Sequence, residues 1–156
     1  MIGQILLQLI LIALNAIFAC AEIAVISSNE TRIDKLAEQG SKPAKRLQAL
    51  QNRPAQFLAT IQVAITLSGF LGSAFAADHF SEALVQLLVN WGVAIPQATL
   101  QTISVVLITI LLSFLTLVFG ELVPKRIAMR KAESIALGIS GMIQVLSKLC
   151  SPLVWL

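Results

Sequence analysis

Three long stretches of this sequence are almost free of charged residues, and this feature limits the fold more than any other. They run Ile2–Ile26, Ala55–Ala77 and Ala98–Phe119. Each reaches the roughly 20 residues that a helix needs to cross the hydrocarbon core of a bilayer. Only 12% of the residues are charged and 57% are hydrophobic, whereas soluble domains are about a quarter charged. The sequence therefore predicts an all-α membrane protein with three transmembrane helices.

A fourth apolar stretch, Ile135–Leu156, has a different pattern. Polar side chains recur along it at helical spacing and share one face: Ser140, Gln144, Ser147, Lys148 and Ser151. A polar stripe opposite an apolar one is typical of a helix that lies in the membrane interface. We expect such an interfacial helix here, and a fourth crossing of the bilayer is the alternative.

The basic residues predict the orientation. Six of them lie between the first two spans: Arg32, Lys35, Lys42, Lys45, Arg46 and Arg53. The other five follow the third span: Lys125, Arg126, Arg130, Lys131 and Lys148. The connection 78–97 has none, so the N-terminus is expected outside, and both segment 27–54 and the C-terminus in the cytoplasm. The net charge of +3 fits this topology and contact with the lipid bilayer; it does not indicate nucleic acid.

Segment 30–50 has helical periodicity that is interrupted at Gly40 and Pro43. Two short juxtamembrane helices at the cytoplasmic surface are therefore predicted.

Small residues in the second span, Gly69, Gly72 and Ser73, predict a packing face that one subunit cannot cover. We therefore expect a two-fold symmetric dimer.

The third span ends in LTLVFGELVPKRIAMRK, which places a carboxylate and a helix-breaking residue at its end. A carboxylate such as Glu121 costs several kcal/mol in a membrane unless it is paired, hydrated or bound to a cation. Pro124 has no N–H and leaves the carbonyl of Gly120, or of a neighbour, without its helical partner. A carboxylate beside a free carbonyl fits a hard cation. The alternative is a salt bridge from Glu121 to Lys125, one turn later.

At these residues the sequence resembles a known family. GELVPKRIA resembles the Gly-Glu-hydrophobic-hydrophobic-Pro-Lys signature of the CorC/CNNM magnesium transporters, in particular their bacterial haemolysin-like branch. ACAEIAVISSNETRIDKLAEQG, ATIQVAITLSGFLGSAF and CSPLVWL are similar to other segments of the family, in the same order. The resemblance covers nearly the whole chain.

The resemblance implies a homodimer in a bacterial inner membrane, with a cation between the spans near the Pro124 turn. It also implies cytoplasmic CBS domains, which bind adenine nucleotide, and a further C-terminal domain. We therefore expect residues 1–156 to be the transmembrane domain alone, with ATP bound only by those other domains.

Two positions depart from the family pattern. Ala19-Cys20-Ala21-Glu22 stands where many members have Ser-Gly-Ser-Glu, so a hydroxyl is missing. Ile65-Thr66 stands where many members have Asn-Asn, so an amide is lost. Both changes reduce the number of side-chain ligands expected around the cation and leave the identity of the ion open.

The sequence thus predicts transport of a divalent cation, with magnesium efflux as the expected activity. The expected metal ligands are Glu121, Gly120 and Thr66, and the wider cation site adds Pro124, Gln62, Ala21, Glu22 and Ser28. No nucleophile, general-base pair or phosphate loop indicates an enzyme. Two alternatives stay open: a non-transporting membrane anchor for nucleotide-sensing domains, and a transporter of sodium or another metal.

Overall fold

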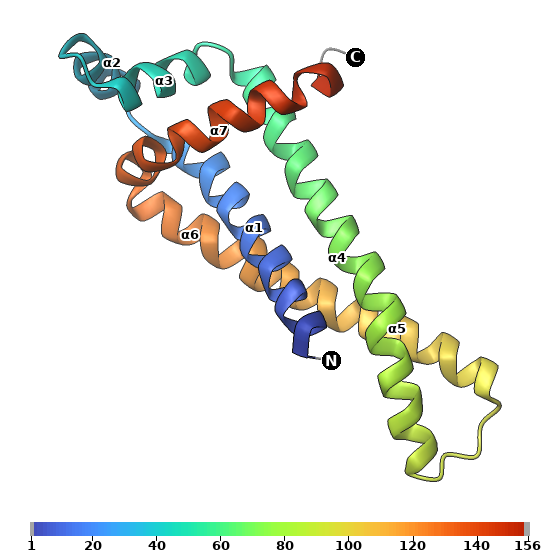
Figure 1. Ribbon diagram of the computed structural model, residues 1–156. Coiled ribbons are helices and arrows are strands. Elements are labelled where there is room, and N and C mark those ends of the chain that lie inside the picture. Colours follow the sequence, from blue (N-terminus) through green and yellow to red (C-terminus); the bar gives the residue numbers. More distant parts are fainter. Residues whose placement is uncertain (1, 155–156) are drawn as a thin grey trace.

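The computed structural model describes residues 2–154, and within this range every regular element is a helix (Figure 1). The long helices are α1 (Ile2–Ser27), α4 (Pro54–Asn90), α5 (Gln97–Leu117) and α7 (Ala132–Val154). Between them lie the shorter α2 (Glu30–Glu38), α3 (Lys42–Gln51) and α6 (Val123–Arg130), and the π-helical turn η1 (Val118–Leu122). The predicted all-α membrane fold is confirmed.

Four helical runs are long and apolar enough to cross a membrane: Ile2–Ser27, Pro54–Asn90, Gln97–Arg130 and Ala132–Leu153. The first three contain the predicted spans. The fourth is α7, which lies across the ends of α1 and α4, beside α3 (Figure 1). Length and composition alone therefore do not separate a fourth crossing from an interfacial helix, whereas the position of α7 in the fold is that of a helix covering one end of the others.

The second span is longer than predicted. The connection was expected to begin at Asp78, but α4 continues to Asn90. It ends in a Schellman turn, where the N–H of Val93 donates to the carbonyl of Leu88 and Gly92 takes a φ of +78°. A left-handed residue of this kind is what stops a helix at a glycine. The acidic residues of 78–82 did not end the helix, because charged side chains on an exposed face cost an α-helix little.

The predicted break between the two juxtamembrane helices is confirmed. Gly40 has a φ of +92° and ends α2, where the N–H of Ser41 donates to the carbonyl of Leu36. Ser41 then caps α3, because its Oγ accepts from the N–H of Ala44 at 3.4 Å. Pro43 lies in the first turn of α3, where its missing N–H has no helical partner to lose.

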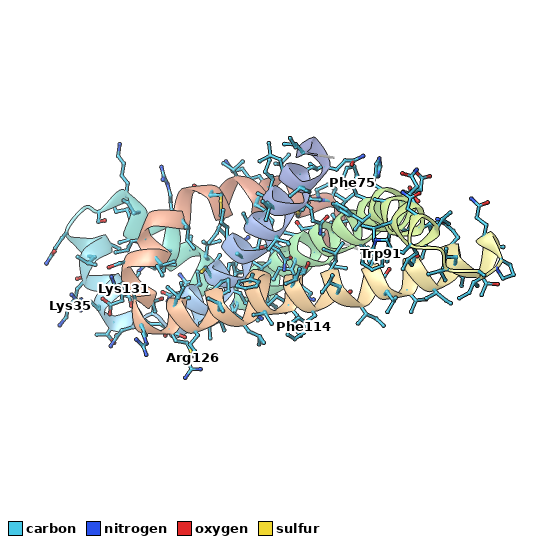
Figure 2. The ribbon with its side chains drawn as sticks, turned by 90° about the horizontal axis from the view of Figure 1, so that it is seen from below. Lys35, Phe75, Trp91, Phe114, Arg126 and Lys131 are labelled. Atoms are coloured by element: carbon cyan, nitrogen blue, oxygen red, sulfur yellow. The ribbon has the colours of Figure 1, made fainter. Side chains whose placement is uncertain are left out.

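The hydrophobic core lies at one end of the molecule, where α1, α2, α3, α4, α6 and α7 meet. Its fully buried members include Ile33, Leu47, Ile61 and Ile143. Lys35, Arg126 and Lys131 gather at this same end, and Trp91 lies toward the opposite end (Figure 2). The spans beyond the core pack more sparsely and leave apolar side chains exposed, as surfaces that face lipid or another subunit do.

Candidate cation site

The third predicted span does not run straight into α6 but widens into the π-helical turn η1. The N–H of Val123 donates to the carbonyl of Val118, one residue farther back than in an α-helix. Pro124 follows at once, is buried, and has no N–H to donate to the preceding turn. A single π-helical turn inside a longer helix often marks a functional site.

The carbonyl of Gly120, which was expected to face a cation, is instead contacted by α1. The Nδ2 atom of Asn15 donates to this carbonyl at 3.4 Å, and Asn15 is only 1% exposed. A Cβ at Gly120 would lie 3.1 Å from the same nitrogen. Gly120 therefore allows the close approach of the two helices, and its carbonyl is a partner of Asn15.

One face of α1 carries polar side chains seven residues apart, at Gln8, Asn15 and Glu22. Gln8 is 5% exposed and lies against Gly72, where a Cβ would meet its Nε2 at 3.4 Å. The buried Oε1 of Gln8 and Oδ1 of Asn15 accept no hydrogen bond from the described residues. This face therefore presents acceptor oxygens between the helices.

Lys125 pairs with Glu22 and not with Glu121. Its Nζ lies 3.0 Å from Oε2 of Glu22, which makes an ion pair although that oxygen accepts no hydrogen bond of regular geometry. The alternative Glu121–Lys125 bridge is therefore absent. Within residues 2–154, no basic side chain lies within salt-bridge distance of Glu121.

Glu121 lines a cavity of about 330 Å³ between α1, α4 and α5. Its polar lining residues come from all three helices and the π-helical turn: Gln8, Ser73, Ser113, Thr116 and Glu121. Gly69, Leu112 and Leu117 complete the lining. Glu121 is the one charged residue among these, so the cavity combines a single carboxylate with hydroxyl and amide groups.

The structure places two expected ligands of the second span outside this cavity. Gln62 and Thr66 lie on the same stripe of α4 as Gly69 and Ser73 but nearer its N-terminal end, and both are exposed. The Nε2 of Gln62 donates to Oγ1 of Thr66 at 3.5 Å. Gly69 and Ser73 line the cavity together with Glu121, whereas Gln62 and Thr66 do not.

The first-span candidates have other partners. Ala21 is fully buried in the core, and Glu22 is paired with Lys125. The Oγ of Ser28 donates to the carbonyl of Val25 and accepts from Nε2 of Gln51, both at 2.9 Å. Ala21, Glu22 and Ser28 thus hold the helices together, and none of them lines the Glu121 cavity.

Gln8, Ser113 and Thr116 were not predicted as site residues, and Ser73 was predicted only as part of a packing face. The spacing of Gln8 from Asn15 and Glu22 could have identified it, because residues seven apart share a helix face. The described residues contain no group of three or more His, Cys, Asp or Glu that could hold a metal ion. Any cation here would meet mostly neutral oxygens and water.

The long apolar helices and the cavity lined by Glu121 define an integral membrane domain with a polar site between its helices. The chain belongs to the CNNM family: the family's cyclin M transmembrane N-terminal domain matches residues 6–156.

Curated bacterial proteins are similar to the chain over nearly all of its length. A UPF0053 protein of Synechocystis sp. is 36% identical over 147 residues, which cover 94% of this chain and 32% of the relative. UPF0053 protein YhdT of Bacillus subtilis is 30% identical over 155 residues, 99% of this chain and 33% of the relative. The polyamine export protein of Escherichia coli K12 is 30% identical over 155 residues, 99% of this chain and 34% of the relative. The chain thus spans about a third of each of these proteins.

Proposed function

We propose that this domain transports a small cation across a bacterial inner membrane through the cavity at Glu121, with magnesium as cargo and outward as the direction. The observation that carries the proposal is a carboxylate that faces a cavity between the helices and has no basic partner there. Such a group in a membrane needs a cation or water near it. Membership of the CNNM family supports a membrane role for the domain.

The chemistry of the lining favours a hard cation that keeps part of its hydration. The available ligands are oxygens of Glu121, of the hydroxyl groups at Ser73, Ser113 and Thr116, and of Gln8. Magnesium is bound in this way, through one or two carboxylates and several waters. One carboxylate implies weak binding, on the order of 1 mM or about −4 kcal/mol. Sodium accepts the same ligands and is the cargo to compare.

The remaining expected ligands take supporting roles in this proposal. Gln62 and Thr66 are exposed on α4 outside the cavity and contact the cation only on its way to or from Glu121. Gly120 and Pro124 maintain the widened turn that presents Glu121. Glu22 acts through its pair with Lys125, which holds α6 against α1.

The test is cation flux from proteoliposomes that contain the 156-residue chain. We expect magnesium flux in the wild type and a loss of about tenfold or more in Glu121→Gln, because a contact to a charged group is worth roughly 1.5–3 kcal/mol. Magnesium should also raise the melting temperature of the wild type by mass action, and Glu121→Gln should lose most of that shift. Absence of flux for every cation tested would instead favour the non-transporting anchor for nucleotide-sensing domains.

A polyamine is the second candidate cargo. Relatives from Escherichia coli and Haemophilus influenzae are named polyamine export proteins. The ammonium groups of a polyamine would use the same carboxylate and hydroxyl acceptors, and the cavity has no cluster of carboxylates that would favour a metal ion instead. Competition between magnesium and spermidine in the same flux assay separates the two cargoes.

We propose further that the domain acts as a homodimer, in which exposed apolar side chains form the contact in place of Gly69, Gly72 and Ser73. Gly72 is covered by Gln8 of the same subunit, and Gly69 and Ser73 line the cavity. The apolar side chains that we propose for the contact are on α4 and α5, at Phe70, Ile110 and Phe114, which are 69%, 62% and 59% exposed. Mass measurement in lipid nanodiscs tests this, and a monomer at all concentrations would contradict it.

A further inference from the structure

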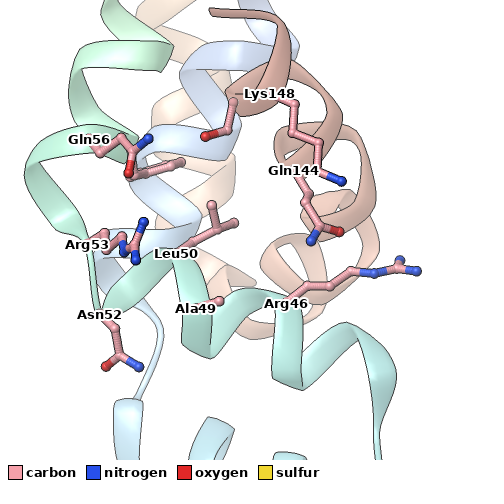
Figure 3. Close-up of a pocket in the computed structure, with 10 residues that line it drawn as sticks. Arg46, Ala49, Leu50, Asn52, Arg53, Gln56, Gln144 and Lys148 are labelled. Carbon is pink, nitrogen blue, oxygen red and sulfur yellow. The ribbon is translucent and has the colours of Figure 1, made fainter. Parts of the chain in front are cut away.

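A second cavity lies at the basic end of the molecule, remote in sequence from the Glu121 turn. It has a volume of about 520 Å³ and lies between α3, the start of α4, and α7. Figure 3 shows Arg53 and Gln56 on one side, Gln144 and Lys148 on the other, and Leu50 between them. We call this space the α3–α7 cavity.

Its lining is cationic. Three basic residues line it, and no acidic residue does: Arg46, Arg53 and Lys148. Three amides join them: Asn52, Gln56 and Gln144. In the part of the chain that the structure describes, the ion pairs are Arg32–Glu133 and Lys125–Glu22, so none of the three cations is paired. Three unneutralised positive charges around one space attract an anion.

The backbone adds to this attraction. Arg53 is the N-cap of the 37-residue α4, and no side chain caps that helix end. The positive end of the helix dipole therefore lies at the cavity wall formed by Arg53 and Gln56. Because Pro54 has no N–H, the free N–H groups of this first turn are those of Ala55 and Gln56. Helix N-termini of this kind favour phosphate and other anions.

Arg46 is accommodated by a glycine on the neighbouring helix. Its Nη1 atom lies 3.0 Å from the position that a Cβ of Gly141 would take. A larger residue at this position in α7 would displace the guanidinium group. The approach of α3 to α7 thus provides room for the basic side chain that connects them.

The surface of α7 beside the cavity carries a row of exposed apolar side chains. Val145, Leu149 and Leu153 are 60%, 70% and 57% exposed and form an apolar row next to the polar row of Gln144 and Lys148. An amphipathic helix with such a row lies in the interface, with its basic side chains at the depth of the headgroups. Leu50 and Phe57 add apolar surface inside the cavity itself.

We propose that the α3–α7 cavity binds the phosphate headgroup of an anionic phospholipid. Basic pockets between helices on the cytoplasmic side of membrane proteins bind such headgroups. The phosphate would lie among Arg46, Arg53 and Lys148, and the acyl chains would follow the apolar row of α7. This site is independent of which cation the Glu121 cavity carries.

The test compares melting temperatures of the 156-residue chain in detergent micelles that contain phosphatidylglycerol or phosphatidylcholine at equal mole fraction. We expect phosphatidylglycerol to raise the melting temperature of the wild type more than phosphatidylcholine does. The variant R46Q/R53Q/K148Q should lose most of this difference. Lys148→Gln alone, at an exposed position, should lose part of it and provides the test if the triple variant does not fold.

The matched control is K35Q/K42Q/K45Q, which removes the same charge from exposed positions of α2 and α3 that lie outside the cavity. This control should retain the lipid-dependent shift. Direct binding of phosphatidylglycerol, followed by native mass spectrometry, should weaken about fivefold for each cavity residue lost and roughly a hundredfold in the triple variant.

Three results would overturn the proposal. The first is a full phosphatidylglycerol-dependent shift in both cavity variants. The second is an equal loss of the shift in the control, because binding would then follow total charge alone. The third is an equal shift from millimolar inorganic phosphate without lipid, because the cavity would then be a site for a soluble anion.

Discussion

The Nζ atom of Lys125 lies 3.0 Å from Oε2 of Glu22, so the first basic residue after the π-helical turn pairs with α1. The two side chains are 32% and 19% exposed. The pair fixes α6 against α1 next to the contact between Asn15 and Gly120. Glu121 therefore faces the cavity without Lys125, the partner that a spacing of four residues in the sequence suggests.

This ion pair should contribute measurably to stability. Glu22→Gln and Lys125→Gln should each lower the free energy of unfolding, because each leaves a partly buried charge without its partner. A double-mutant cycle should give a coupling of about 1–2 kcal/mol. Unfolding by SDS titration in mixed micelles measures it.

The Arg32–Glu133 pair is the control for that cycle. Its side chains are 70% and 31% exposed, and their ends are also 3.0 Å apart. A more exposed pair should couple by only about 0–0.5 kcal/mol. A larger coupling for Arg32–Glu133 than for Glu22–Lys125 would contradict the structural role given to the partly buried Glu22–Lys125 pair.

Gly120→Ala should destabilise the domain by about 1–3 kcal/mol, because the new Cβ would crowd Nδ2 of Asn15. Asn15→Ala alone should also destabilise, since it removes the donor to the Gly120 carbonyl. The double variant should cost less than the sum, because the smaller residue removes the clash. Gly138→Ala is the control: its Cβ would meet nothing within 4 Å, so stability should be unchanged or higher. Equal effects at Gly120 and Gly138 would be inconsistent with a close α1–η1 contact.

Cation transport should depend more on the hydroxyl groups that line the cavity than on Gln62 and Thr66, which lie outside it. Ser113→Ala and Thr116→Val should each lower flux about fivefold, the effect of one lost contact of about 1 kcal/mol. Thr66→Val and Gln62→Leu should change it less than about twofold, because both residues are exposed and lie outside the cavity. If Thr66→Val has the largest effect of the four, Thr66 is a direct ligand, as the family pattern implies.

The C-terminal side of α7 should be cytoplasmic. A reporter fused after Leu156 is expected to show cytoplasmic activity, because α7 lies across the ends of α1 and α4 and the basic residues gather at that end. A second reporter in the 92–96 connection should report the outside. External activity of the first fusion would mean that α7 crosses the bilayer.

The helices and the end of one of them were predicted from local patterns. Apolar length predicts the spans, and Gly40 predicts the end of α2, where it takes a left-handed conformation; the end of α4 at Gly92 was not predicted. These features depend on neighbouring residues and on the solvent, so they need no knowledge of distant contacts. Of the candidate site, Glu121, Gly120 and Pro124 were found in the same way, because a carboxylate, a glycine and a proline are costly at the end of a span.

The partners of these groups were decided only by the tertiary structure. Asn15 and Gly120 are 105 residues apart in the chain, and Glu22 and Lys125 are separated almost as widely. Position 125 lies one turn after Glu121, but the π-helical turn changes the direction of the following side chains, and α1 supplies a competing carboxylate. The spacing of residues along one helix predicts which side chains share a face of that helix, but not which side chains of other helices they contact. Which of two carboxylates a lysine reaches, and which side of a polar stripe becomes a cavity, depends on how separate helices pack.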